Sequence, residues 1–318
     1  RGGRGRGGRD RDADGDREDV TVEGTVELLG NGSGFLRLSP PEPSDDDVYI
    51  SAAQVRRCEL VTGDKVAGPM RPPRRSERYP SLIRIDTIND RSADEVAEGT
   101  PFDELPCGFP TERLALGSDD PTLKAIEWLT PLGRGSRATI VGAARAGKTE
   151  ALRRLATALG TTDALEVTVV LAGVRPEEVP AWRASGIEPV STLSFAASPD
   201  GQAQAIERAV ETAKRVAARG GDAVVLIDTL NYVDPRSARR ALAAARNITD
   251  GGSLTIIATA DLPLGGETTV IALDATLTAT GRFPALDLVA SGALHAELLV
   301  GEAGADAIAQ ARGTAIAG

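Results

Sequence analysis

The first third of the chain carries short runs of alternating apolar and polar residues, which follow an opening segment that is almost entirely polar. Residues 20–29 alternate as a half-buried strand does. Further short apolar runs are separated by polar turns and lie at residues 35–38, 48–50, 65–68 and 81–85. Several short strands joined in this way predict a small β-barrel over residues 20–95.

The pattern changes after residue 120, where continuous apolar runs alternate with helical periodicity. The expected buried strands and helices lie at residues 138–141, 150–156, 165–171, 202–218, 223–228 and 253–260. This alternation predicts an α/β domain with a mainly parallel sheet over residues 121–302. The polar, proline-containing segment 96–120 is expected to be a linker, and residues 303–318 a C-terminal tail or short helix.

A glycine-rich stretch with the form G-x-x-x-x-G-K-T joins an expected strand to an expected helix at residues 142–149. Glycines let the backbone wrap so that its N–H groups converge on phosphate oxygens. The lysine of such a loop reaches the β- and γ-phosphates, and the threonine hydroxyl binds Mg²⁺. The alternative is an ordinary glycine-rich turn at the start of a helix. The predicted nucleotide-binding residues are Gly142, Arg145, Ala146, Gly147, Lys148 and Thr149.

An acidic residue ends one of the expected buried strands, because the apolar run 223–227 is followed by Asp228. Many buried strands end at aspartate, so this pattern alone is weak. Together with a phosphate loop, it predicts that Asp228 and Thr149 hold Mg²⁺ beside a bound ATP.

Composition narrows the function classes. The 318 residues carry a net charge of −10, which argues against a protein that coats nucleic acid, although a local basic site stays open. The two cysteines, Cys58 and Cys107, exclude a zinc ribbon, and the single histidine argues against a histidine-based metal site or triad. The absence of a transmembrane-length apolar run and of a signal peptide leads us to expect a cytoplasmic protein without membrane contact.

The barrel region offers side chains suited to single-stranded nucleic acid, because bases stack on rings while arginines hold phosphates. The candidates are Phe35, Arg37, Tyr49, Arg78 and Tyr79. The alternative is that these rings form the core of a barrel that serves only assembly. Residues 1–19 are expected to be a disordered, RGG-like tail, which either touches RNA or is simply solvated.

Six segments of the chain occur in the order known from one protein family. They are Gly34-Phe35-Leu36-Arg37, Asp47–Ser51, Glu77-Arg78-Tyr79, Arg175–Val179, Gly251–Ala260 and Phe283-Pro284-Ala285. The chain thereby resembles the family of the bacterial transcription termination factor Rho, from about residue 24 to residue 300. The resemblance implies a cold-shock-like OB barrel followed by a RecA-like P-loop ATPase domain. It also implies a hexameric ring that binds single-stranded RNA, and RNA polymerase becomes a candidate partner.

The resemblance also assigns site residues. It implies a primary RNA site that prefers pyrimidines and is formed by Phe35, Arg37, Tyr49, Glu77, Arg78 and Tyr79. In the nucleotide site, Lys148, Thr149 and Asp228 match the triphosphate and Mg²⁺ positions. Phe283 matches the ring that stacks on adenine.

Several catalytic features of the family are missing. The family has an Asp-Glu pair whose glutamate activates water, and these positions are Gly173 and Val174 here. Valine cannot accept a proton, so the general-base role has no occupant. The arginine finger falls at Leu294. Both channel loops are also unrecognisable, since the segments 229–248 and 261–281 are shortened.

Three functional hypotheses follow. The first is a Rho-like protein linked to transcription termination or RNA regulation, which binds RNA and ATP with weak or absent hydrolysis and translocation. The second is an active RNA-dependent ATPase in which Glu177 replaces the base, and Arg175 or Arg282 the finger. The third is a nucleotide-dependent oligomeric scaffold whose barrel contacts protein.

Overall fold

The computed structural model describes residues 20–39, 43–74, 76–97, 100–162 and 164–317. The chain divides into two compact units at Gly99 and Thr100, and each is described by itself. The expected tail at residues 1–19 lies outside the described residues. Among the described helices, none combines the length and the hydropathy needed to cross a membrane.

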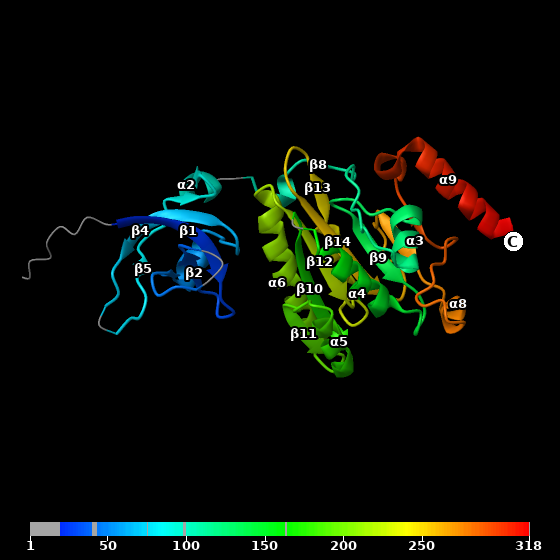
Figure 1. Cartoon of the computed structure of the whole chain (residues 1–318), viewed down its shortest axis with the longest axis horizontal. Coiled ribbons are helices and arrows are strands. Elements are labelled where there is room, and N and C mark those ends of the chain that lie inside the picture. Colours follow the sequence, from blue (N-terminus) through cyan, green and yellow to red (C-terminus); the bar gives the residue numbers. More distant parts are fainter. Residues whose placement is uncertain (1–19, 40–42, 75, 98–99, 163, 318) are drawn as a thin grey trace, which may run out of the picture. The chain divides into compact units, whose positions relative to one another are not determined.

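The first unit is a five-stranded barrel with a small hairpin beside it (Figure 1). Its elements are β1 (Val20–Leu28), β2 (Gly34–Arg37), β3 (Val48–Ile50), α1 (Ala52–Arg57), β4 (Lys65–Arg71), β5 (Ser81–Leu82), β6 (Thr87–Ile88), β7 (Arg91–Ser92) and α2 (Ala93–Ala97). The sheet follows the order β1-β2-β3-β5-β4, and β1 also pairs with β4. That second pairing closes the sheet on itself, which leaves the barrel strands with few free edges.

Alternation along the barrel strands separates its core from its surface. Leu36 is fully buried, whereas its neighbour Phe35 is only half-buried on the opposite face of β2. Val48 and Ile50 are buried in the same way, and Tyr49 between them is exposed. The core consists of aliphatic side chains, namely Val26, Leu36, Val48, Ile50, Val55, Leu60, Val66, Leu82, Ile85 and Ile88. The barrel is therefore filled without its surface aromatic rings.

The second unit is built on a nine-stranded sheet. Its strands are β8 (Cys107–Gly108), β9 (Arg137–Val141), β10 (Glu166–Val174), β11 (Ser191–Ser194), β12 (Asp222–Asp228), β13 (Arg246–Ile248), β14 (Ser253–Ala260), β15 (Thr269–Ala272) and β16 (Gly292–Ala293). The main path runs β11-β10-β12-β14-β9-β15-β16, and all pairings but the last are parallel. The predicted architecture, an α/β domain with a mainly parallel sheet preceded by a small β-barrel, is confirmed.

Helices cover the sheet of the second unit (Figure 1). They are η1 (Phe102–Glu104), α3 (Pro121–Leu129), α4 (Lys148–Leu159), η2 (Pro176–Glu178), α5 (Val179–Ala184), α6 (Pro199–Ala218), α7 (Pro235–Ala243), α8 (Ala275–Ala279) and α9 (Glu297–Ala317). One large core joins α3, α4 and Trp182 of α5 to alternate residues of β9, β10 and β12. Helix α6 packs on β10 and β12 from outside this core, with α7 beside it.

One segment differs from the sequence expectation. Most of the expected linker 96–120 belongs to the second unit, because Leu114 and Leu116 are buried in its core and β8 pairs with β13. Pro106 and Pro110 lie in loops on either side of this short edge strand, and Pro101 precedes η1, so none of them has to supply a ladder N–H. Residues 303–317 are helical, which is one of the two expected alternatives, since α9 runs through them to Ala317, with one break in the helical backbone at Gly301.

Candidate nucleotide cleft and nucleic-acid surface

The phosphate loop lies between β9 and α4, as the sequence predicts. Gly147 caps the start of α4 with a φ of 90°, a left-handed conformation that strains other residues. A Cβ atom at Gly147 would stand 2.9 Å from Cε2 of Phe283 and 3.0 Å from Cβ of Pro284. The loop and the Phe283 ring are therefore in close contact, although the two lie far apart in the sequence.

A cleft of about 880 Å³ opens beside this loop, at the C-terminal ends of β10, β12 and β14. In a parallel sheet this edge is the usual place for a ligand. The cleft brings together most of the residues predicted to bind nucleotide, which are Arg145, Ala146, Gly147, Lys148, Thr149, Asp228 and Phe283. Gly142 does not line it, but its carbonyl accepts a hydrogen bond of 2.6 Å from Lys148 Nζ.

Asp228 has one satisfied and one unsatisfied oxygen. The residue is 3% exposed, and its Oδ1 accepts a hydrogen bond of 2.7 Å from Thr259 Oγ1. Burial raises the pKa of Asp228, and hydrogen bonds from Thr259 and Thr149 oppose that rise. Its Oδ2 is buried and has no hydrogen-bond partner among the described residues. A buried acceptor without a partner, next to a threonine hydroxyl, suits a hydrated Mg²⁺ that accompanies phosphates.

The phosphate-loop lysine has an acidic neighbour that the sequence did not indicate. Lys148 Nζ lies 2.6 Å from Oδ1 of Asp261, which follows β14 directly. Asn231 holds Asp261 in place, because its Nδ2 donates to Asp261 Oδ1 at 3.1 Å and its Oδ1 accepts from the Asp261 N–H at 2.8 Å. The lysine ammonium is thus shared between a carboxylate and the loop carbonyl of Gly142.

The wall formed by the end of β10 is apolar. Gly173 has a φ of 91°, and a Cβ atom built on it would lie 2.3 Å from Cδ2 of Tyr232. Val174 next to it is 4% exposed and belongs to the large core. Neither residue offers an acceptor for a proton, and the Tyr232 ring covers the space above Gly173.

The weaker catalytic candidates are scattered. Arg175 and Glu177 line the cleft, but the guanidinium of Arg175 is paired with Glu178 at 2.6 Å. Arg282 precedes Phe283 on the exposed surface and does not line the cleft. Leu294 is 56% exposed and also lies outside it. The structure therefore brings two of the three candidates to the nucleotide region.

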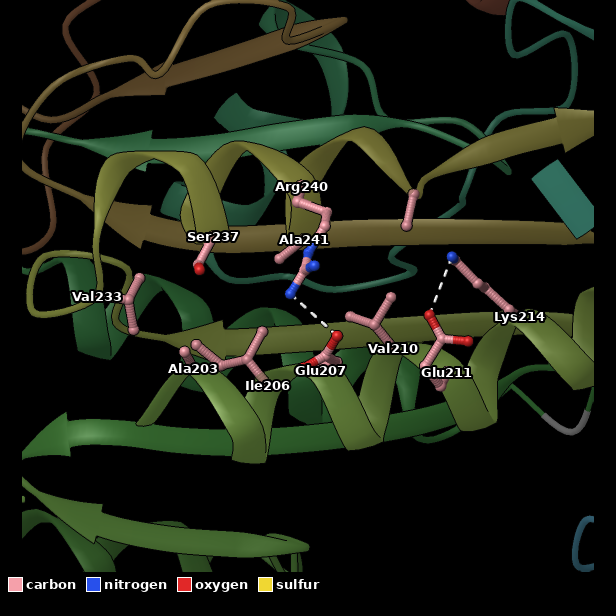
Figure 2. A pocket seen from close by; sticks show the side chains of 11 residues that line it. Ala203, Ile206, Glu207, Val210, Glu211, Lys214, Val233, Ser237, Arg240 and Ala241 are labelled. Atoms are coloured by element: carbon pink, nitrogen blue, oxygen red, sulfur yellow. Dashed lines mark hydrogen bonds and ion pairs between the residues drawn. The ribbon is translucent and has the colours of Figure 1, made fainter. Parts of the chain in front are cut away.

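A second, smaller cavity of about 130 Å³ lies between α6 and α7 (Figure 2). Ion pairs flank it, with Arg240 Nη2 3.0 Å from Glu207 Oε1, and Lys214 Nζ 3.0 Å from Glu211 Oε1. Its remaining lining is mostly aliphatic. None of the predicted site residues contributes to it, so it is not part of the nucleotide cleft.

Three aromatic rings meet on the outer face of the barrel. Phe35 lies opposite Tyr49 in the β2–β3 ladder, with ring centroids 5.9 Å apart in an edge arrangement. The Tyr79 ring is 4.8 Å from that of Phe35. Because none of the three belongs to the barrel core, they are available as a stacking surface. We call Phe35, Tyr49 and Tyr79 the aromatic cluster.

The charged residues predicted for the same surface have different environments. Arg37 is buried and bridges Glu27 and Asp47, each at 2.6 Å, so it supports the barrel. Arg78 is exposed and pairs with exposed Asp45 at 2.9 Å, while its guanidinium lies 5.2 Å from the Tyr79 ring centroid. Arg78 is therefore the more accessible of the two arginines.

Glu77 lies in a loop beside the aromatic cluster and is tied to a neighbouring arginine. Its two carboxylate oxygens accept hydrogen bonds of 2.6 and 2.9 Å from Arg71. These bonds, with one from the Arg74 N–H, lower the pKa of Glu77 to about 2. The carboxylate therefore stays ionised well below neutral pH.

The sequence analysis missed Asp261, Asn231 and Tyr232, all of which line the cleft. One signal was available, because Asp261 directly follows an apolar run that adjoins the phosphate-loop strand in the sheet. Asn231 and Tyr232 sit in the short connection from β12 to α7, and no pattern marks them.

One comparison with known proteins matches the first unit, and others match most of the chain. The family model of the RNA-binding domain of Rho termination factor matches residues 22–94. Transcription termination factor Rho of Thermotoga maritima is 34% identical over 322 residues, which cover 88% of this chain and 75% of that protein. The Bacillus subtilis Rho is 32% identical over 328 residues, covering 91% of this chain and 77% of that protein.

A solved structure shares the fold over about two thirds of the chain. It is a prototypical ATPase from the type III secretion system of pathogenic bacteria, with a TM-score of 0.55. The alignment is 20% identical and covers 66% of this chain and 70% of that one. At this identity the likeness concerns the fold alone.

Proposed function

Because the chain belongs to the family of transcription termination factor Rho, we propose that it binds single-stranded RNA through the aromatic cluster and Mg²⁺-nucleotide through the cleft, with weak or absent ATP hydrolysis and translocation. Its biological role is then in transcription termination or RNA regulation. Within this proposal, ATP is a structural or regulatory ligand rather than a substrate that is hydrolysed to drive translocation.

One observation carries this proposal: the cleft gathers the groups that would hold a nucleotide, while the two residues at the family's Asp-Glu positions, Gly173 and Val174, offer no proton acceptor. Lys148, Thr149 and Asp228 supply a cation, a hydroxyl and an acceptor with a spare oxygen. At the end of β10, Val174 is buried and Gly173 lies under the ring of Tyr232. Binding needs only the first set of groups, whereas hydrolysis also needs a base to orient water.

The shortened connection after β12 supports the absence of translocation. The strand ends at Asp228 and α7 begins at Pro235, so six residues join them. A connection of this length leaves no long loop that could reach toward a bound RNA strand. We also propose that the chain assembles into a ring, as its family resemblance implies, and that RNA polymerase is a partner.

Steady-state ATP hydrolysis, measured with and without pyrimidine-rich RNA, tests the proposal alongside ATP binding by calorimetry. We expect ATP to bind with little turnover, RNA to leave that turnover unchanged, and Lys148→Ala to abolish binding. RNA-stimulated turnover would instead support the active ATPase, for which Glu177 in the cleft wall is the residue to remove.

A gain-of-function variant tests whether ATP hydrolysis is missing because of positions 174 and 294. Val174→Glu with Leu294→Arg supplies the base and the finger together, and a lost finger alone costs on the order of 10³-fold in turnover. Native mass spectrometry with and without ATP reports assembly. A single monomeric species under both conditions contradicts the ring.

A further inference from the structure

A carboxylate occupies the open side of the phosphate-loop lysine. The Lys148 side chain is 14% exposed, whereas the Asp261 side chain that pairs with it is 68% exposed. The second hydrogen bond of Lys148 goes back to Gly142 within the loop. Asp261 is therefore the lysine's contact on the cleft side.

The position of Asp261 is fixed by the sheet. Strand β14 lies between β9, which leads into the phosphate loop, and β12, which ends at Asp228. As the first residue after β14, Asp261 emerges between the lysine and the Mg²⁺ position. The reciprocal hydrogen bonds with Asn231 connect the loops after β12 and β14 and keep the carboxylate facing Lys148.

A triphosphate and a diphosphate place different demands on this arrangement. A phosphate-loop lysine contacts both the β- and the γ-phosphate. A γ-phosphate at Lys148 brings negative charge within a few ångströms of the Asp261 carboxylate, and like charges at that range repel. A diphosphate places its β-phosphate on the lysine and leaves the remaining side of the ammonium to Asp261.

We propose that Asp261 makes the cleft selective for nucleoside diphosphates over nucleoside triphosphates, because its carboxylate takes the place on Lys148 that a γ-phosphate needs. This inference rests on the proposed nucleotide site and specifies its preferred ligand. ATP still binds, but more weakly than ADP.

The other cationic side chains of the cleft do not offset the repulsion between the Asp261 carboxylate and a γ-phosphate. Arg175 is paired with Glu178, and Arg153 is paired with Glu150. Arg145 forms no ion pair within the described part of the chain, and it belongs to the phosphate loop, where it serves either ligand. The lysine that would neutralise a γ-phosphate is the one that Asp261 already holds.

Calorimetric titration of the full chain with Mg²⁺-ADP and with a non-hydrolysable Mg²⁺-ATP analogue tests the inference. We expect the wild-type chain to bind ADP about tenfold more tightly than the analogue, in line with one unfavourable charge pair near a surface. Asp261→Asn keeps the size of the side chain and its hydrogen bonding to Asn231 while removing the charge. We expect it to bring the two affinities within about threefold, mainly through tighter binding of the analogue.

Asp250→Asn is the matched control. Asp250 lies before β14, at the opposite end of that strand, and has a φ of 55°, a conformation that asparagine tolerates as well as aspartate. Equal wild-type affinities for both ligands, or an unchanged ratio in Asp261→Asn, overturn the inference while leaving the nucleotide site intact. Failure of both ligands to bind refutes the site itself and the inference with it.

Discussion

The ring of Tyr232 covers the backbone of Gly173 so closely that a Cβ atom on Gly173 would lie 2.3 Å from Tyr232 Cδ2. Gly173 is the next-to-last residue of β10 and has a φ of 91°. Both the backbone conformation and the overlying ring therefore favour glycine at this place. An acidic side chain cannot be accommodated there without moving the tyrosine.

This contact predicts the effect of adding one methyl group. We expect Gly173→Ala to lower the free energy of unfolding by about 2 kcal/mol, because the new Cβ meets the ring and the backbone is strained. In a Tyr232→Ala background the same change should cost about 1 kcal/mol, since the backbone strain and a 3.1 Å approach to Gln202 Oε1 remain. Urea unfolding followed by tryptophan fluorescence measures both, because Trp128 and Trp182 lie in the second unit. Equal costs in the two backgrounds would contradict the role of the ring.

The buried ion pairs of Arg37 predict that its removal lowers the stability of the barrel rather than acting directly on RNA contacts. Removing it leaves Asp47, which is 0% exposed, without its guanidinium partner. We expect Arg37→Ala to destabilise the barrel by about 2–3 kcal/mol. Hydrogen exchange of residues 20–97 reports this as faster exchange throughout the unit. Arg84→Ala, which breaks an exposed pair with Asp86, is the control and should change stability by less than about 0.5 kcal/mol.

The exposed position of Arg78 predicts that its removal weakens RNA binding without lowering stability. Because its pair with Asp45 is exposed on both sides, we expect Arg78→Ala to leave stability unchanged and to weaken binding to single-stranded RNA. The slope of log affinity against log salt should fall by about one. Asp45→Ala frees the arginine and should strengthen binding. Fluorescence anisotropy with labelled oligopyrimidine measures all three proteins, and identical curves would exclude Arg78 from the RNA site.

The Arg71–Glu77 pair predicts how the first unit responds to acid. The folded-state pKa of Glu77, about 2, is below the unbonded value of 4.5. A carboxyl group with a lowered pKa contributes stability that is complete above pH 4.5 and is lost as the pH falls toward 2. We expect Glu77→Gln to be less stable at pH 7 and to lose less stability between pH 4.5 and 2. NMR of barrel amide resonances follows this, and parallel pH profiles for both proteins would contradict it.

Local pattern predicted the barrel strands and the phosphate loop, because their signals lie within a few residues of each other. The sequence left open whether Phe35 belongs to the barrel core, and the structure places it on the face of β2 opposite to buried Leu36. The pairing of Lys148 with Asp261 could not be predicted, since the two are 113 positions apart and meet only through the order of β14 and β9.

The segment 96–120 shows that a local sequence pattern can also give a wrong prediction. Its prolines and polar residues are those of a linker, yet Leu114 and Leu116 anchor it in the core of the second unit. Two buried leucines in a polar context carry no periodic signal. Their partners lie in other elements of the sheet and its helices, and only the folded chain brings them together.

The packing of Tyr232 on Gly173 has a bearing on the history of this protein. A carboxylate introduced at position 173 would meet steric overlap with the ring and backbone strain, and the position of the family's water-activating glutamate is the neighbouring Val174. Removing Tyr232 first would relieve the overlap, but Gly173 would still supply no carboxylate. Restoring an Asp-Glu pair at positions 173 and 174 therefore requires substitutions at both positions and at Tyr232, so single substitutions tend to keep the cleft in its present form.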